Sequence, residues 1–277
     1  MTIYDISYIL LFNKKHTKRE GSLLYEIICS CTTDKGKRRR INQDNIVCDH
    51  TYLDHSDENN GYHKNIRISL KYPVIAGVFD GLGGEQCGEK ASFIAAKEAA
   101  GLVFDHDITD ILTDYVRKTN RKICDFAASN DIASMGTTAA VIVFDRKRLY
   151  VCNIGDSKIF LLNDGKMTQL SEDHVSSAPQ GVKAPLTQCL GIPEEKLRLE
   201  PHIFNMRLTK ESVFLICSDG LTDMVGIPEI TDILTKETTE NASGMLVKKA
   251  LEHGGKDNVS VIVCRAARKK LFQKRVN

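Results

Sequence analysis

The sequence lacks the patterns that define disulfide-rich, zinc-ribbon and membrane proteins. Its nine cysteines are odd in number, scattered and without a Cys-x-x-Cys pair, which favours reduced, mostly buried thiols. The N-terminal run MTIYDISYILLF is interrupted by Asp5, and its lysines follow instead of preceding it. It is also shorter than the about 20 apolar residues of a membrane span. We therefore expect a cytoplasmic protein that does not bind a membrane.

The sequence also shows no strong charge of one sign and no internal repeat. A net charge of +2 gives no reason to expect nucleic acid as a partner. The length of 277 residues, with 42% hydrophobic and 27% charged residues, suits one large globular domain. We expect a lead-in segment at 1–22, one domain at 23–267 and a basic tail at 268–277. No oligomerisation seam is visible, so a monomer is expected.

Strand-like runs dominate the middle and the end of the chain. They are rich in β-branched and aromatic residues and lie at 23–31, 72–79, 138–144, 148–154, 158–162, 212–217 and 258–264. Asn163-Asp164-Gly165 predicts a hairpin turn. Helical periodicity occupies 88–104, 107–129, 227–237 and 242–254, whereas the polar stretch 50–66 predicts a loop or ragged hairpin. The spacing predicts inward faces made of Ala91, Ile94, Ala95, Glu98 and Leu102 in the first helix and of Ile108, Ile111, Leu112, Val116 and Ile123 in the second. These elements indicate antiparallel sheets covered by helices, an α+β fold.

Four aspartates fall at the ends of these strands. Asp80 and Asp219 follow apolar runs, Asp257 precedes one, and Asp44 begins another. A single aspartate beside a turn is usually a turn former, but several carboxylates at one rim repel each other unless a cation is present. An all-oxygen ligand set suits Mg²⁺ or Mn²⁺. The pattern therefore favours a metal site.

The glycines after Asp80 allow a second interpretation, a phosphate-binding loop. That alternative is weaker, because the stretch GLGGEQCG has neither the Gly-Lys-Ser/Thr ending nor the G-x-G-x-x-G spacing. In the metal interpretation Gly81 offers its carbonyl, while Gly83 and Gly84 let the backbone turn. Arg39 stands in a run of three arginines, which is usually a solvated face, although its forked donors also suit phosphate oxygens.

Together these motifs resemble one family, the metal-dependent protein serine/threonine phosphatases (type 2C, or PPM), in their bacterial form. The resemblance runs in chain order over residues 23–265. It rests on DKGKRRRINQD (34–44), FDGLGGEQCGEKAS (79–92), MGTTAAVIVF (135–144), NIGDSKIFLLNDGKMTQLSEDH (153–174), LTQCLG (186–191), CSDGLTDMV (217–225) and GGKDNVSVIV (254–263). It implies a four-layer α-β-β-α sandwich of two mainly antiparallel sheets, with a dimetal centre at one end.

The resemblance also implies roles for single residues. Asp80 bridges two Mn²⁺ or Mg²⁺ ions, with the Gly81 carbonyl beside it, while Asp219 and Asp257 hold one ion. Asp44 acts through metal-bound water, and Arg39 binds phosphate. Asp131 is either a ligand of a third ion or a helix-end carboxylate. The implied reaction is hydrolysis of phosphoserine and phosphothreonine in proteins by direct attack of a water that the two metals activate, opposing a cognate Ser/Thr kinase.

Some positions depart from the family pattern. Leu82 stands where eukaryotic relatives carry a histidine proposed as general acid, so the leaving group takes its proton from water or another residue. The segment 175–185 is shorter than the flap usual there. The turn of Asn153, Gly155, Asp156 and Ser157, the strand entry at 136–138 and His174 have structural explanations. The alternatives to a phosphatase are a catalytically inactive module with this fold, used for regulation or binding, and a metal-dependent nuclease.

Overall fold

The computed structural model describes residues 25–54, 61–82, 87–146, 148–179, 184–209 and 211–268. The lead-in 1–22, the tail after Arg268, and Gly83 and Gly84 lie outside these ranges. The proposed boundaries of the lead-in and tail therefore stay predictions.

Two six-stranded sheets form the centre of the molecule, and every strand pairing in them is antiparallel. The first has the order β11 (Lys166–Gln169), β10 (Lys158–Asn163), β13 (Val213–Cys217), β14 (Val259–Arg268), β1 (Tyr25–Asp34), β4 (Tyr62–Ser69). The second has the order β12 (His202–Arg207), β9 (Arg148–Ile154), β8 (Ala139–Asp145), β5 (Val74–Phe79), β2 (Asn45–Cys48), β3 (Thr51–Tyr52). A short ladder joins β6 (Gly81–Leu82) to β7 (Gly136–Thr137).

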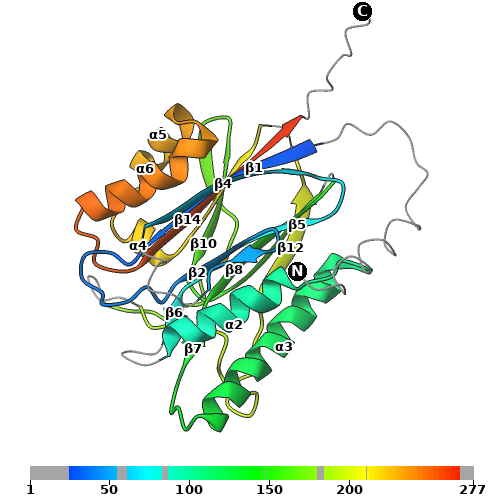
Figure 1. Ribbon diagram of the computed structural model, residues 1–277, viewed down its shortest axis with the longest axis vertical. Coiled ribbons are helices and arrows are strands. Elements are labelled where there is room, and N and C mark those ends of the chain that lie inside the picture. Colours follow the sequence, from blue (N-terminus) through cyan, green and yellow to red (C-terminus); the bar gives the residue numbers. More distant parts are fainter. Residues whose placement is uncertain are drawn as a thin grey trace, which may run out of the picture.

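Helices cover the outer face of each sheet. α5 (Ile227–Lys236) and α6 (Thr239–Glu252) lie over the first sheet, with α6 against β1 and β14. α2 (Gly88–Ala100) and α3 (Ile108–Ser129) lie over the second sheet (Figure 1). A four-residue helix, α4 (Asp219–Thr222), follows β13. The arrangement is the predicted four-layer α-β-β-α sandwich.

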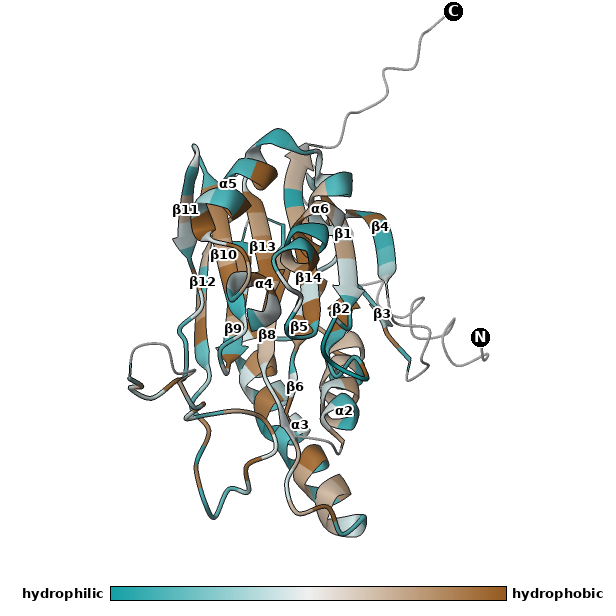
Figure 2. Cartoon of the chain, turned by 90° about the vertical axis from the view of Figure 1, so that its left-hand side faces the viewer, coloured by the Kyte–Doolittle hydropathy of each residue, from teal (hydrophilic) through white to brown (hydrophobic). Residues whose placement is uncertain are grey.

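The core is divided among three layers of contact, one between the sheets and one under each helix pair. Figure 2 shows hydrophobic residues along the central strands β10, β13 and β14. All nine cysteines are free and six are buried, with Sγ of Cys29 3.2 Å from Sγ of Cys264. The expectation of reduced, mostly buried thiols agrees with this packing.

The two long helices of the second layer bury different kinds of side chain. On α3 the predicted stripe of Ile108, Ile111, Leu112, Val116 and Ile123 is buried as expected. On α2 the fully buried residues are Gly88, Ala91, Ser92, Ala95, Ala96, Ala99 and Ala100. Ile94, predicted to face inward, is partly buried and packs against the same core, whereas Glu98 is partly buried and pairs with Lys122. Small side chains let the helix lie closer to β2 and β5, and that close packing selects the face.

Two of the longer strands were not predicted, and both are at the edges of sheets. β4 begins inside the polar stretch 50–66, and β12 lies in a stretch where no element was expected. Both strands are only partly buried, so they show no continuous apolar run. Charged and polar residues are the usual composition of an edge strand, because they discourage pairing with other chains.

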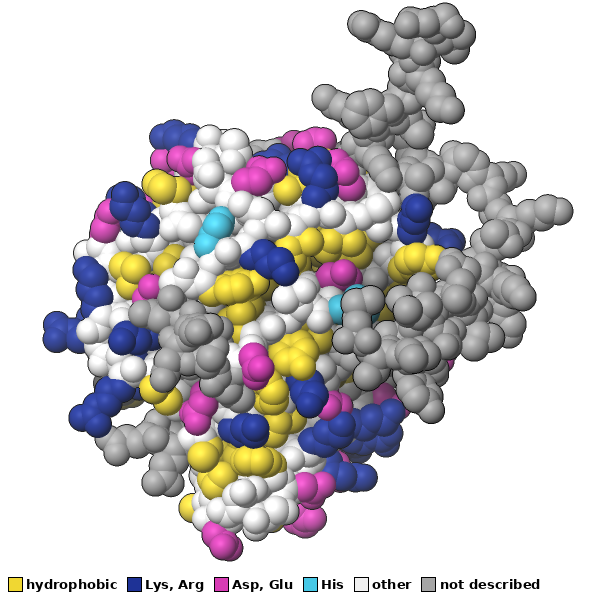
Figure 3. Space-filling view, in the orientation of Figure 1, with side chains coloured by type: hydrophobic (Ala, Val, Ile, Leu, Met, Phe, Trp, Pro, Cys, Tyr) yellow, Lys and Arg dark blue, Asp and Glu magenta, His cyan; other side chains and the backbone are white. Residues whose placement is uncertain are grey.

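The face seen in Figure 3 carries acidic and basic side chains interspersed with hydrophobic ones. Within the described ranges, no helix has the length and apolar character needed to cross a membrane.

Candidate metal centre

The fold brings the four strand-end aspartates to one end of the sandwich. Asp80 follows β5 and Asp219 opens α4 directly after β13 and Ser218, while Asp44 and Asp257 lie just before β2 and β14. Burial raises the pKa of Asp80 well above its ordinary value, and the charges of neighbouring carboxylates raise it further. Those neighbours are Asp44, Asp219, Asp156 and Asp257. The carboxylates therefore form one electrostatically coupled cluster.

Asp44 is one of the two buried aspartates among the predicted ligands, with only 5% of the residue exposed, against 4% for Asp219. Burial raises its pKa to about 7, although hydrogen bonds from Ser260 and Ser218 oppose that shift. Both hydroxyls donate to Oδ2, at 2.7 Å and 2.8 Å. The other oxygen, Oδ1, is buried and accepts no hydrogen bond. Such an oxygen is a site for a cation or a water.

The backbone of Asp80 is held by the Gly136-Thr137-Thr138 motif. Its N–H donates to Oγ1 of Thr138 at 3.0 Å, and its carbonyl accepts from the Thr138 N–H and from Oγ1 of Thr137, both at 2.9 Å. Thr138 is in turn 2.7 Å from Oγ of Ser157. The predicted strand entry therefore fixes the position at which the Asp80 carboxylate leaves the sheet.

Arg39 lies at the exposed rim of this cluster. Its guanidinium donates to Oδ2 of Asp257 at 2.7 Å. This hydrogen bond raises the pKa of Arg39, and the charges of Asp257, Asp80 and Asp219 add to the effect. Asn258 anchors the loop that carries Arg39, because its Nδ2 donates to the carbonyls of Lys35 and Ile41.

Glycine is required at several backbone crossings around the cluster. A Cβ on Gly81 would stand 2.4 Å from the carbonyl oxygens of both Gln43 and Gly88. A Cβ on Gly220 would stand 1.9 Å from the carbonyl oxygen of Asn258. Since real Cβ atoms do not approach backbone this closely, only glycine lets these segments meet beside Asp80 and Asp219.

In the side-chain arrangement of the described residues, no three His, Cys, Asp or Glu side chains stand close enough together to hold an ion. Asp257 contacts Arg39, and the carboxylates repel one another. The arrangement brings together the residues that a cation would draw inward, and their all-oxygen donors fit Mg²⁺ or Mn²⁺.

Two further residues from the sequence analysis lie outside this contact network. Asp131 is exposed, directly after the C-cap of α3, with a left-handed φ of 53°. That geometry fits the helix-end alternative, and its role as a third-ion ligand stays a prediction. Nδ1 of His174 accepts the Gly155 N–H at 3.2 Å, in line with the structural explanation.

The sequence analysis missed Ser218 and Ser260 and gave Asp156 only a turn role. Both serines lie inside motifs already noted, next to Asp219 and three residues after Asp257. The signal available in the sequence was a serine close to each of two proposed metal ligands. Asp156 is 8% exposed and acts electrostatically on Asp80, so its turn places a fifth carboxylate near the cluster.

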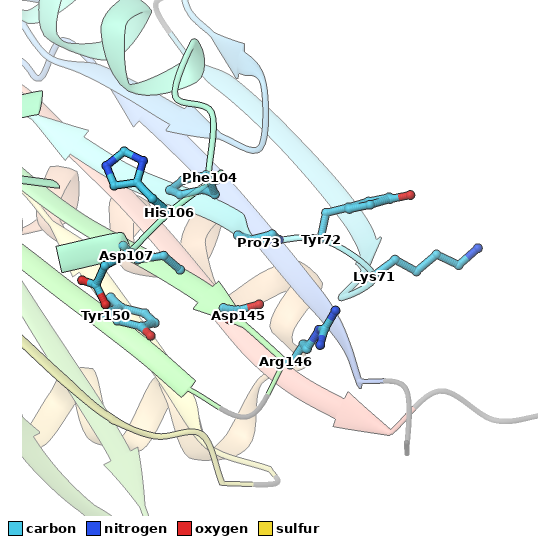
Figure 4. A pocket seen from close by; sticks show the side chains of 10 residues that line it. Lys71, Tyr72, Pro73, Phe104, His106, Asp107, Asp145, Arg146 and Tyr150 are labelled. Carbon is cyan, nitrogen blue, oxygen red and sulfur yellow. The ribbon is translucent and has the colours of Figure 1, made fainter. Parts of the chain in front are cut away.

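A separate cavity lies at the other end of the second sheet. It has a volume of about 270 Å³ and is lined by residues before β5, by the start of α3 and by the β8–β9 turn, among them Tyr72, Phe104 and Tyr150 (Figure 4). None of the predicted site residues lines it. The residues predicted from the sequence lie at the opposite, carboxylate end.

Solved structures share this architecture with the chain. The structure of the catalytic domain of the serine/threonine protein phosphatase PstP, in complex with two manganese ions, superimposes with a TM-score of 0.71 at 25% identity. The match covers 88% of this chain and 99% of that one.

The family model described as "Protein phosphatase 2C" matches residues 44–181, and the chain belongs to this family. The serine/threonine phosphatase stp of Listeria innocua is 30% identical over 232 residues, covering 76% of this chain and 89% of the relative. PstP of Mycobacterium tuberculosis is 32% identical over 218 residues, covering 72% of this chain and 42% of the relative. The chain is thus a serine/threonine protein phosphatase of the bacterial 2C type, a metal-dependent family whose members act on phosphoproteins.

Proposed function

We propose that this phosphatase works with two Mn²⁺ or Mg²⁺ ions held by Asp80, Asp219, Asp257 and the carbonyl of Gly81, with Asp44 bound through water. The observation that carries the proposal is the group of aspartates at this end, in which Asp44 and Asp219 are buried and in which burial and mutual repulsion raise the pKa of Asp80 and Asp44. Such a cluster is costly for a fold unless a cation neutralises it.

Three features of the residues support the fit to divalent ions. The donors are carboxylate and carbonyl oxygens, which hard cations prefer. Oδ1 of Asp44 is buried and unengaged. The backbone around Gly81 excludes any side chain at that position. The two manganese ions in the PstP structure show that a related catalytic domain holds such a pair.

Two bound divalent ions would supply positive charge to the phosphoryl group and lower the pKa of a water molecule. The chain's own residues do the remaining work. Arg39, at the rim, binds two phosphate oxygens through its guanidinium and so aligns the phosphoryl group over the carboxylates. Oδ1 of Asp44 accepts a hydrogen bond from water and orients it. Thr137 and Thr138 hold Asp80 rigidly in place.

The proposed substrates are phosphoserine and phosphothreonine in proteins, formed by a Ser/Thr kinase whose action this enzyme reverses. We place the enzyme in the cytoplasm and as a monomer. The free thiols support a reducing compartment. The mixed charges in Figure 3 and the net charge of +2 support a protein partner over nucleic acid.

The experiment is phosphate release from a phosphothreonine peptide with Mn²⁺, with Mg²⁺ and with EDTA, in the full chain and in Asp219→Asn. We expect release that needs the metal and disappears in the variant. A folded wild-type protein that binds Mn²⁺ but releases no phosphate would favour the inactive binding module. Cleavage of single-stranded DNA in place of the peptide would favour the nuclease.

A further inference from the structure

A closed set of hydrogen bonds surrounds Asp44 on the side away from the other carboxylates. Oδ2 accepts from Oγ of Ser260 at 2.7 Å and from Oγ of Ser218 at 2.8 Å. The two serines also contact each other, since the Ser260 N–H donates to Oγ of Ser218 at 3.0 Å. Both serines are fully buried. Solvent therefore cannot replace either hydroxyl.

The network extends through two more residues and returns to Asp44. Oγ of Ser260 is 2.7 Å from Oγ1 of Thr33, which accepts from Nδ2 of Asn42 at 2.8 Å. Oδ1 of Asn42 accepts the backbone N–H of Asp44 at 3.2 Å. The ring thus runs from the side chain of Asp44 through three residues to its own backbone.

The direction of every proton in this ring is determined. Each serine has one hydroxyl hydrogen, and both are given to Asp44. Ser260 must then accept from the hydroxyl of Thr33, and Thr33 must accept from the amide of Asn42. Because each of these donors makes one hydrogen bond in the ring, no side chain of the ring can rotate without leaving a buried polar group unsatisfied. A buried unsatisfied group is costly, so the ring has one stable arrangement.

We propose that Ser218 and Ser260 are positioning residues that set the metal affinity of the site by fixing which oxygen of Asp44 faces it. With Oδ2 held by two hydroxyls, the carboxylate cannot rotate, and the unengaged Oδ1 is the oxygen left for the ion's hydration water. This inference rests on the proposed role of Asp44 in metal binding.

The placement of the two serines links the proposed ligands to one another. Ser218 directly precedes Asp219, and Ser260 is three residues after Asp257. Through their hydroxyls, the two serines connect Asp44 to β13 and β14, the strands next to these ligands. A shift of either strand would therefore move Asp44 with it, which keeps the ligand set in register.

The test measures Mn²⁺ binding to the full-length protein by calorimetry after removal of metal with EDTA and dialysis. We expect Ser260→Ala and Ser218→Ala to bind Mn²⁺ about 10-fold to 100-fold more weakly, the usual effect of losing a partner that orients a ligand. At saturating Mn²⁺, the kcat of these variants should be closer to the wild-type value than their Mn²⁺ affinity is. Ser260→Thr, which keeps the hydroxyl, should stay near wild type.

The chain offers a matched control in Ser243. Its Oγ is 2.6 Å from Oγ of Ser30 and 2.7 Å from Oγ1 of Thr32, and it is also fully buried. Ser243→Ala therefore removes an equivalent buried hydroxyl from a network that does not include Asp44. Its stability should fall as in the other alanine variants, while its Mn²⁺ affinity should stay within about twofold of wild type.

Asp44→Asn separates failure of this inference from failure of the proposed function. If Asp44→Asn weakens Mn²⁺ binding and the serine variants do not, the positioning role is overturned and the proposed function stands. If Asp44→Asn leaves Mn²⁺ binding unchanged, both the proposed role of Asp44 and this inference are overturned. An equal loss of affinity in Ser243→Ala would also overturn the inference. Should Ser260→Ala not fold, Ser218→Ala decides the question alone.

Discussion

The guanidinium of Arg39 donates a 2.7 Å hydrogen bond to Oδ2 of Asp257, although 218 residues separate them. The proposed phosphate-binding residue and a proposed metal ligand are thus each other's partner. The side chains are 49% and 26% exposed, so this ion pair is worth at most about 1 kcal/mol. A cation at Asp257 and a phosphate at Arg39 can therefore replace it at little cost.

Arg39→Ala should raise KM for a phosphothreonine peptide by about 10-fold to 100-fold, the range expected for a charge-assisted hydrogen bond. Its Mn²⁺ affinity should not fall, because the change removes a cation that competes for Asp257. Steady-state kinetics and calorimetry on the same variant measure the two effects.

Arg38→Ala is the matched control, since Arg38 is exposed in the same run of arginines. Arg38→Ala should leave the KM for the peptide and the affinity for Mn²⁺ near their wild-type values. A collapsed kcat with unchanged KM in Arg39→Ala would contradict a role in phosphate binding.

Asp80→Asn should abolish metal-dependent hydrolysis and, in EDTA at neutral pH, stabilise the protein. The charged form of Asp80 is disfavoured by burial and by the charges of Asp44 and Asp219, and the amide never takes that form. Loss of such strain at a functional site commonly raises the free energy of unfolding by about 0.5–2 kcal/mol. Denaturant unfolding in EDTA tests this. Asp232→Asn, at an exposed ion pair on α5, is the control and should change neither the hydrolysis nor the stability in EDTA. A destabilised Asp80→Asn would show that the carboxylate cluster is not strained.

The stability of the protein in EDTA should fall as pH rises from about 4 to about 7. The pKa of Asp44 is raised in the folded state from its ordinary 3.8 to about 7. The folded state therefore holds a proton that the unfolded state releases, so this stabilisation is full below about pH 4 and lost by about pH 7. Each pH unit inside that window costs up to about 1.4 kcal/mol for this group.

Chemical unfolding at several pH values gives that slope. It should flatten in Asp44→Asn, which cannot ionise, and in excess Mn²⁺, because the ion binds the deprotonated carboxylates. An equally steep slope in Asp44→Asn would assign the effect to other groups.

Gly81→Ala should destabilise the protein by about 1–3 kcal/mol or more and impair Mn²⁺ binding, because the added Cβ would stand 2.4 Å from two carbonyl oxygens. Gly101→Ala is the control, since its Cβ would stand at an ordinary 3.6 Å from the carbonyl oxygens of Lys97 and Glu98. That variant should stay within about 0.5 kcal/mol of wild type. Thermal unfolding with and without Mn²⁺ compares them, and a neutral Gly81→Ala would refute the need for glycine there.

Much of the fold was predictable because its central elements carry strong local patterns. β9 has the predicted bounds, and the Asn163-Asp164-Gly165 hairpin joins β10 to β11 with positive φ at Asp164 and Gly165. The edge strands β4 and β12 carry no such pattern, since every residue in them is exposed or only partly buried. The inward face of α2 was predicted only in part, because close packing on the sheet also selected the small residues Ala96, Ala99 and Ala100.

By itself the sequence determined the family, the layered fold and the aspartates at strand ends, because these follow from contiguous motifs and local periodicity. Only the tertiary structure decided how those aspartates are held. Ser218 and Ser260 reach Asp44 across 174 and 216 residues. Their meeting depends on the register that pairs Cys217 with Val261 in neighbouring strands. A shift of one residue would turn these hydroxyls to the opposite face, and nothing local in the sequence encodes that alignment.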